Sequence, residues 1–344
     1  MKKESNFPIM NDISFIKTIL MLLVVLYHSS VFWTGTWFSD IAVSQDSTFL
    51  NFFSKRLNSF HIHTFTLVSG YIFNFLYGKG KYRKFRKFFV KKIKRLIVPY
   101  WFITMVWLIP ISVVLFSMDF RKVFYNFILC INPDQLWFLW MLFNVFVMSW
   151  FLGSHIKKNN YAIFICFLSY CLSFIGGKLI PNIFCIWSAL RFLTFFLIGM
   201  KLEEKLDKKL KQIPVFFYII VHSILFIIVT ILSCKTGLIY TLLYLGFTYI
   251  MNIAGSLMAF YVLRDISAKF DWQNSKLFNI LSNKTMIIYL FHQQIIYFTI
   301  ILLNGKIPPL LNMLVNFITA MFISYIISVL LLKNKTTRML VGEK

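Results

Sequence analysis

Residues 14–33 read SFIKTILMLLVVLYHSSVFW, an apolar run with a single charged side chain, Lys17. A helix needs about 20 mostly apolar residues to cross the hydrocarbon core of a bilayer, and this run is long enough. Of the 344 residues, 59% are hydrophobic and only 14% are charged, which is more apolar surface than one water-soluble core can bury. No small-residue cleavage site follows the run, so we interpret it as a membrane span rather than a signal peptide.

Similar runs recur along the whole sequence and bring the expected number of spans to about ten. They are residues 14–33, 58–77, 96–117, 136–153, 161–175, 184–200, 214–233, 238–262, 278–302 and 310–332. Backbone polar groups in lipid must be satisfied within the segment, and the runs lack the alternation of a β-barrel strand. The sequence therefore predicts an all-α, polytopic transmembrane helix bundle. We expect one membrane domain over 1–344 and no soluble domain.

Lysine and arginine are distributed unevenly between the segments that join these spans. Of the 36 basic residues, 26 fall in segments on the side of the N-terminus, seven on the other side and three inside spans. Cytoplasmic loops carry the excess of positive charge, so both termini are predicted to be cytoplasmic. The net charge of +24 then reflects topology and contact with anionic lipid, and nucleic-acid binding is not expected. The five cysteines show no metal-ligand spacing, so no metal site is expected.

Ionisable side chains inside the spans are costly and are therefore candidates for function. Lys17 and His28 are eleven residues apart in the first span. That separation is about three helical turns, or ~16 Å, so both point to nearly the same face. His61 opens the second span, and His292 lies in the polar run His292-Gln293-Gln294 of the ninth. Each also has a simpler explanation, because a lysine can extend to the membrane interface and a histidine can pack between helices.

These residues are also ordered across the membrane. The three histidines fall in the outer half, whereas Lys17 lies in the inner half, near the ten basic residues of 78–95. Arg191 lies inside the sixth span, where it needs a partner, a carbonyl group or a water-filled cavity. This order would suit a polyanionic cofactor on the cytoplasmic side and a neutral acceptor outside.

Several motifs that contain these residues resemble those of the integral membrane acyltransferases of family 3, which O-acetylate bacterial surface polysaccharides and similar glycans. The matching stretches are Lys17-x10-His28, Phe60-His61 with Ser69-Gly70-Tyr71, Lys92-x-x-Arg95 with Lys94 to Tyr100, Leu136 to Leu139, and Ile288 to His292. Together these stretches extend over most of the chain, and they follow one another in the same order as in the family. Two positions depart from the pattern. Lys17 stands where arginine is usual, and lysine cannot form the two-pronged contacts of arginine. His63 stands where proline is usual. No hydrolase-like domain follows the last span.

The resemblance implies a multi-pass acyltransferase of the bacterial cytoplasmic membrane. It would transfer an acyl group, expected to be acetyl, from cytoplasmic acyl-CoA to a hydroxyl of a cell-surface polysaccharide or its lipid-linked precursor. His28 is expected to be a general base or a transient acyl carrier. Tyr289 and His292 are expected to orient it or bind the acceptor.

The resemblance also implies roles for residues away from this centre. Lys17, Lys92 and Arg95 are expected to bind the phosphates of acetyl-CoA, which serves as acyl donor. Contact with substrate or structural support is expected from His61, Ser69, Tyr71, Trp137 and Arg191.

Two other functions are compatible with polar residues inside spans. A polysaccharide exporter is the main alternative, although no inverted repeat or pair of broken helices is visible. A non-catalytic scaffold is the second, and it would tolerate loss of His28. An acyl group on the cell's glycan that depends on His28 would separate these functions. The acceptor sugar, the choice between acetyl and succinyl, and the oligomeric state stay open.

Overall fold

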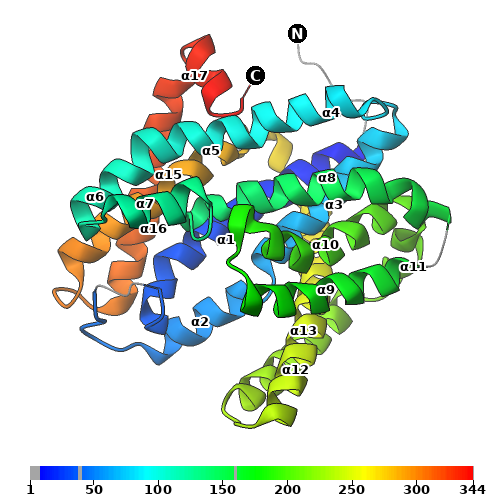
Figure 1. The fold of residues 1–344 in the computed structure, drawn as a ribbon, viewed down its shortest axis with the longest axis horizontal. Coiled ribbons are helices and arrows are strands. Elements are labelled where there is room, and N and C mark those ends of the chain that lie inside the picture. The colour runs from blue at the N-terminus through cyan, green and yellow to red at the C-terminus, as the bar shows by residue number, and fades with distance from the viewer. Residues whose placement is uncertain (1–7, 38–40, 159–160, 344) are drawn as a thin grey trace.

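The computed structural model describes residues 8–37, 41–158 and 161–343, and every regular element within them is a helix (Figure 1). In this part of the chain, nine helical segments are long and apolar enough to cross a membrane. They are Asp12–Thr34, Phe85–Phe116, Asp134–Gly153, Ala162–Leu179, Ile183–Lys201, Val215–Ser233, Leu238–Lys269, Thr285–Leu303 and Pro309–Leu331. The expectation of an all-α, polytopic helix bundle is confirmed.

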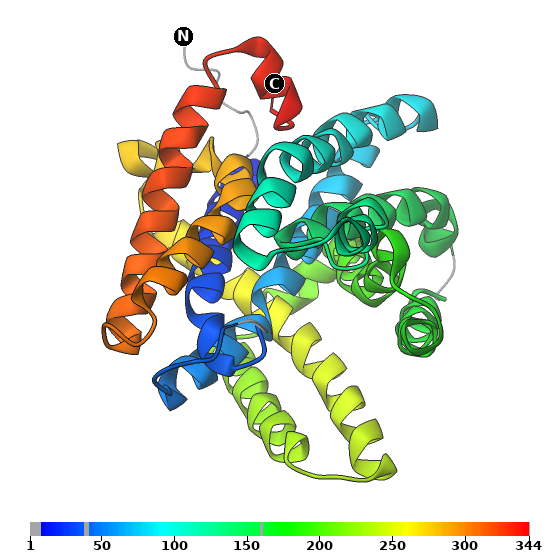
Figure 2. The same cartoon turned by 60° about the vertical axis from the view of Figure 1, so that its left-hand side comes forward.

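The helices follow one another with short connections. The α-helices are α1 Pro8–Ser30, α2 Thr48–Asn58, α3 His61–Gly78, α4 Phe85–Lys92, α5 Val98–Ile103, α6 Ile109–Phe116, α7 Phe120–Val123, α8 Trp137–Lys158, α9 Ala162–Leu179, α10 Ile186–Lys201, α11 Asp207–Leu210, α12 Val215–Ser233, α13 Leu238–Lys269, α14 Lys276–Ser282, α15 Thr285–Leu303, α16 Pro309–Leu331 and α17 Lys335–Leu340. Figures 1 and 2 show both chain ends on the same edge of the molecule, whereas the α12–α13 hairpin extends away from the other helices.

Helix α3 corresponds to the expected second span but is not among the nine apolar segments. It carries His61, His63 and Asn74, which lower its hydropathy, and all three side chains are buried. The other helices surround α3, so protein rather than lipid solvates these polar groups. A helix in this central position can therefore carry residues that a lipid-facing helix cannot.

Two glycines allow α3 to pack closely along α10. A Cβ atom on Gly70 would lie 2.0 Å from the carbonyl oxygen of Phe196, and one on Gly199 would lie 1.9 Å from that of Leu67. Small residues let helix backbones approach in this way inside membranes. The sequence analysis treats Gly70 as part of a family motif, and the structure shows its packing role.

Residues Phe85–Phe116 form one continuous helical run, in which α4, α5 and α6 are joined by the π-helical segments Ile93–Ile97 and Thr104–Leu108. Each π segment lies immediately before a helix that begins with a proline in its first turn, Pro99 or Pro110. Proline cannot donate a backbone hydrogen bond, and a π turn accommodates the resulting break. The sequence analysis expected residues 78–95 to connect two spans. The structure instead begins a helix at Phe85, so the basic residues of the family motif lie on a helix.

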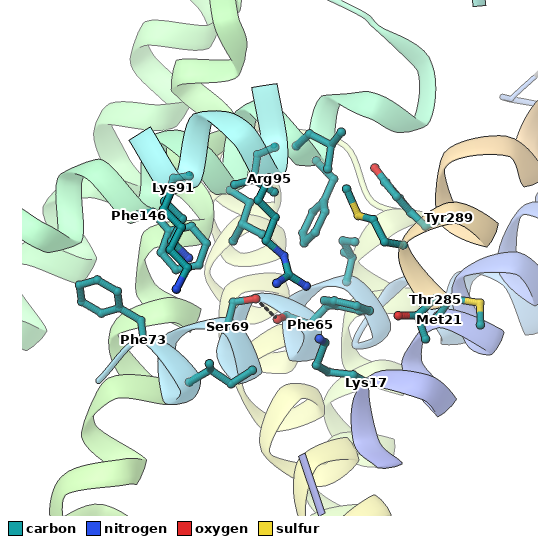
Figure 3. Close-up of a pocket in the computed structure, with 18 of the residues that line it drawn as sticks. Lys17, Met21, Phe65, Ser69, Phe73, Lys91, Arg95, Phe146, Thr285 and Tyr289 are labelled. Carbon is teal, nitrogen blue, oxygen red and sulfur yellow. Dashed lines mark hydrogen bonds between the residues drawn. The ribbon is translucent and has the colours of Figure 1, made fainter. Parts of the chain in front are cut away.

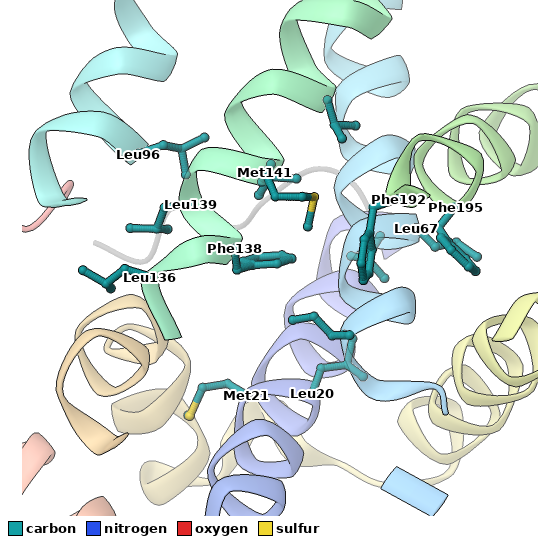
Figure 4. Packing of buried hydrophobic residues seen from close by; sticks show 14 of the residues in the cluster. Leu20, Met21, Leu67, Leu96, Leu136, Phe138, Leu139, Met141, Phe192 and Phe195 are labelled. Carbon is teal, nitrogen blue, oxygen red and sulfur yellow. The ribbon is translucent and has the colours of Figure 1, made fainter. Parts of the chain in front are cut away.

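The main core lies where α1, α3, α8 and α10 meet. Figure 4 shows Leu20 of α1, Leu67 of α3, Phe138 of α8 and Phe192 of α10 packed together in it. All four side chains are buried. This packing sets the rotation of α1 and α3, and so it decides which of their polar residues face the same space.

Candidate active site

A cavity of about 240 Å³ lies between α1, α3, α4, α8 and α15 (Figure 3). Four cationic side chains line it, and they are Lys17, Lys91, Lys92 and Arg95. Among the described residues that form its wall, none is acidic. Figure 3 shows Arg95 and Lys17 extending toward each other from opposite sides of the cavity. Such a cluster of cations is typical of a site for an anion.

Lys92 is the most buried of the four cations, with 7% of its surface exposed. Its ammonium group lies 3.2 Å from the centre of the Phe146 ring and 5.3 Å from that of Tyr82. The faces of aromatic rings attract a cation, so these two rings stabilise the buried charge without neutralising it. The two rings therefore offset part of the cost of burying this cation.

The C-terminal segment reaches the same end of the cavity. Val341 is fully buried, and Gly342 has a left-handed φ of 76°. A Cβ atom on Gly342 would lie 2.7 Å from the carbonyl oxygen of Arg95, so only glycine fits here. Burial raises the pKa of the next residue, Glu343, whereas the charges of Arg95 and Lys17 act to lower it.

A group of histidines lies beyond the other end of the cavity. The rings of His28 on α1 and His292 on α15 have centroids 5.1 Å apart, and Tyr27 lies 4.8 Å from the ring of His61. Nδ1 of His292 is 2.8 Å from the carbonyl oxygen of Tyr289. When Nδ1 donates this bond, Nε2 is left as a proton acceptor. Nε2 of His292 and Nδ1 of His28 are both buried, and the described residues offer neither a hydrogen-bond partner.

The cavity connects these two groups. Val24 and Tyr289 both line it. Val24 lies one helical turn before His28, and Tyr289 lies one turn before His292. Lys17 lies about 16 Å from His28 along α1, as eleven residues of a helix imply. The site thus has a cationic end, an apolar passage and a pair of imidazoles.

Residues 10–333 match the family model of the acyltransferase domain, family 3. The chain belongs to this acyltransferase family. The match includes Lys17, His28, Arg95 and His292, and so covers both ends of the site. Neither a curated protein nor a solved structure matches the chain. The protein is therefore a membrane acyltransferase, and its basic motif lines a cavity that ends one helical turn short of His28 and His292.

Most of the residues expected to form the site of this acyltransferase do converge. Lys17, Ser69, Lys92, Arg95 and Tyr289 line the cavity. The Ser69 hydroxyl donates to the carbonyl oxygen of Phe65 at 2.9 Å. The Tyr289 hydroxyl donates to the backbone carbonyl of Gln135, and its ring centroid lies 6.0 Å from that of His292. His61 supports Tyr27, which in turn packs against His28.

Besides the three histidines beyond its end, three expected residues lie outside the cavity wall. Tyr71 packs against Phe260, with ring centroids 5.9 Å apart, and Trp137 packs against Phe192 at 5.5 Å. The guanidinium of Arg191 lies 4.6 Å from the centre of the Phe174 ring, and its side chain is exposed. Arg191 lies near the middle of the apolar segment Ile183–Lys201, as expected from the sequence. The described contacts of these three residues support packing and give no direct role in the cavity.

Sequence reasoning missed several residues of this acyltransferase site. Lys91, Tyr82 and Phe146 line the cavity, but nothing in their spacing separates them from the other basic and aromatic residues nearby. Gln135 and Gln294 bond to each other across two helices. The polar run that contains Gln294 was visible in the sequence. Its bonding to Gln135, in the segment before α8, was not.

Proposed function

We propose that this acyltransferase transfers an acetyl group from acetyl-CoA, bound at the cationic end of the cavity, to a sugar hydroxyl presented at the histidine end. The sugar belongs to a cell-surface polysaccharide or to its lipid-linked precursor. The observation that carries the proposal is the single cavity, which has Lys17 and Arg95 at one end and ends one helical turn short of His28 and His292.

The cavity fits the chemical character of the donor. Coenzyme A carries several phosphates at one end and a thioester at the other, joined by a flexible, mostly neutral arm. Lys17, Lys91, Lys92 and Arg95 can form charge-assisted hydrogen bonds with the phosphates. The apolar passage between Met21 and Phe138 would hold the arm, which leaves the thioester close to His28.

The imidazole of His28 supplies the chemistry that acyl transfer requires. As a general base it takes the proton of the acceptor hydroxyl, whose oxygen attacks the thioester carbonyl carbon. The carbon–sulfur bond then breaks, and the thiolate of coenzyme A takes a proton from the imidazolium. As a nucleophile, His28 would instead carry the acyl group before the hydroxyl attacks. Both routes need an imidazole nitrogen that is not held by another hydrogen bond, and Nδ1 of His28 has no such partner among the described residues.

The proposed topology places the donor in the cytoplasm and the acceptor outside. Both chain ends lie on the same edge of the molecule. Lys17 is nearer than His28 to the N-terminal end of α1. With cytoplasmic termini, the cationic end of the cavity faces cytoplasmic acyl-CoA. The protein would then act as a multi-pass enzyme of the bacterial cytoplasmic membrane and carry the acyl group across it within one site.

Reconstitution of the purified protein tests this proposal. Proteoliposomes are formed around surface glycan from the producing cells, freed of O-esters by mild base, and receive radiolabelled acetyl-CoA on the outside. We expect labelled acetate on the glycan with the wild type and background values with His28→Ala. Absence of transfer by the wild type contradicts the proposal, and movement of glycan across the vesicle without label would support export instead.

A further inference from the structure

The segment before α8 is fixed onto α15 by a reciprocal pair of amides. Nε2 of Gln135 donates to Oε1 of Gln294 at 2.7 Å, and Nε2 of Gln294 donates to Oε1 of Gln135 at 3.0 Å. Nε2 of Gln135 also lies 3.0 Å from the carbonyl oxygen of Leu290. Both side chains are buried, so this network specifies one arrangement of the segment. The arrangement holds the neighbouring Asp134 in a defined place.

Asp134 is held in an uncommon backbone conformation. Its φ is 43°, which a residue other than glycine adopts only when its surroundings impose it. Its Oδ1 accepts a hydrogen bond of 3.5 Å from the Tyr297 hydroxyl of α15. The residue as a whole is partly exposed. Strain of this kind gathers at functional sites because position matters more there than stability.

Trp37 joins this carboxylate to the proposed catalytic histidine. Its ring centroid lies 5.6 Å from that of His28 and 5.1 Å from that of Tyr297. Trp37 is also partly exposed and lies beyond the end of α1 that is remote from Lys17. An aromatic surface, a carboxylate and an imidazole are therefore neighbours on the side of the site opposite the cations.

Several buried polar atoms around these residues lack a partner within the described part of the chain. They are Nδ1 of His28, Nε2 of His292 and Oε1 of Gln293. Nε2 of Gln293 donates to the hydroxyl of Tyr297, so this amide belongs to the same network. A buried polar atom without a partner needs an explanation. A ligand with several hydroxyl groups would provide one.

We propose that Trp37, Asp134 and Tyr297 form the acceptor subsite, which binds the sugar ring whose hydroxyl is acylated; the inference rests on the proposed function. The apolar face of the ring packs on Trp37, as ligands do on aromatic walls with a few fixed polar groups. Asp134 accepts a hydrogen bond from one sugar hydroxyl. A neighbouring hydroxyl then lies beside His28, which takes its proton.

Steady-state kinetics with the two substrates varied separately test the subsite. The probe is the base-treated glycan of the producing cells, and the variants are Trp37→Ala and Asp134→Asn. Asparagine tolerates a left-handed backbone as well as aspartate does, so the second change removes a charge with little strain. We expect the acceptor KM to rise about tenfold in Asp134→Asn, because a hydrogen bond to a charged group becomes a weaker, neutral one. Trp37→Ala loses the aromatic wall and should raise the acceptor KM in the same direction. The KM for acetyl-CoA should stay within about twofold of wild type.

Two comparisons exclude a merely structural effect. Trp37→Phe keeps an aromatic ring and should restore most of the acceptor affinity that Trp37→Ala loses. Asp119→Asn, in the exposed cap before α7, is the matched control and should leave both KM values unchanged. Coenzyme A should raise the Tm of every variant as it does that of the wild type, because the donor end is intact. If the wild type transfers acetate, an unchanged acceptor KM, or an equal rise in the KM values for both substrates, overturns the subsite. If the wild type transfers no acetate, the proposed function is overturned instead.

Discussion

The imidazole rings of His28 and His292 lie 5.1 Å apart, although one side chain comes from the first span and the other from α15, near the end of the chain. His292 is oriented by the carbonyl oxygen of Tyr289 one turn away, whereas Nδ1 of His28 has no described partner. Each ring keeps one buried nitrogen without a described partner, but only the other nitrogen of His292 lies at hydrogen-bond distance from a backbone carbonyl. This difference assigns the reactive role to His28 and a positioning role to His292.

Replacement of His28 by alanine should abolish acylation without preventing insertion. Removal of a general base typically lowers the rate about 10²–10⁴-fold. The measurement is glycan-bound acetate per unit of membrane protein. His63→Ala is the matched control, because His63 is also buried in a span but stacks on Phe192 and does not line the cavity. It should change protein level modestly, since one interhelical contact contributes about 0.6 kcal/mol, and normal acetate in His28→Ala would remove this residue from the mechanism.

Loss of a cation at the cavity should weaken donor binding and leave acceptor binding unchanged. Hydrogen bonds to charged groups contribute about 1.5–3 kcal/mol, so Arg95→Gln should raise the KM for acetyl-CoA at least about tenfold. Lys91→Met should act in the same direction. Lys87→Met is the control, because Lys87 is exposed one turn earlier on α4 and is not part of the cavity wall. Equal KM values for Lys91→Met and Lys87→Met would contradict the assigned phosphate site.

Glu343 should oppose binding of the donor, because its carboxylate interacts with Arg95 and Lys17 at the end of the cavity that would hold phosphates. Two charges a few ångströms apart near a protein surface interact by roughly 1–4 kcal/mol. Glu343→Gln should therefore lower the KM for acetyl-CoA several-fold, and the effect should shrink at high salt. Initial rates at low and high ionic strength measure this. A higher KM would show instead that the carboxylate positions Arg95.

Labelling of a native cysteine tests the proposed topology. Cys234 is exposed in the turn between α12 and α13, on the side predicted to be extracytoplasmic. A membrane-impermeant maleimide should label the wild type in intact cells, and Cys234→Ser should remove this label. In the Cys234→Ser background, Lys208→Cys should react only after the membrane is permeabilised. Labelling of position 208 in intact cells would reverse the assignment of sides.

The contact between α3 and α10 should not tolerate a larger residue. Gly70→Ala places a methyl group where 2.0 Å separates it from the carbonyl oxygen of Phe196, so the helices must move apart. Overpacking typically costs about 1–3 kcal/mol, and we expect a lower Tm in detergent and a smaller folded fraction. Gly246→Ala on α13 meets no atom within 4 Å and should be neutral or slightly stabilising. Similar Tm values for both variants would contradict the close packing.

Much of the architecture was predictable because lipid imposes simple rules on sequence. Runs of about 20 apolar residues form helices, because a helix satisfies the backbone hydrogen bonds of the segment within lipid. The common face of Lys17 and His28 also follows from helix geometry alone. The structure agrees, since Lys17 lines the cavity and the ring of His28 lies just beyond it.

Other features depend on tertiary packing and were not visible in the sequence. Tyr71 lies two residues after Ser69, yet only Ser69 lines the cavity, because neighbours on a helix point in different directions. Arg191 is on α10, which contributes none of the described residues of the cavity wall. The position of Asp134 could not be foreseen either, because it depends on amides of α15 that lie far away in the sequence.

The wall of the cavity takes residues from α1, α3, α4, α8 and α15. Ribosomes deliver these helices to the membrane one after another, so the first and last contributors are separated by most of the time of synthesis. Until α15 has been inserted, His28 has no imidazole beside it and the cavity lacks one side. A chain whose synthesis stops before α15 therefore lacks one side of the cavity and one of the two imidazoles.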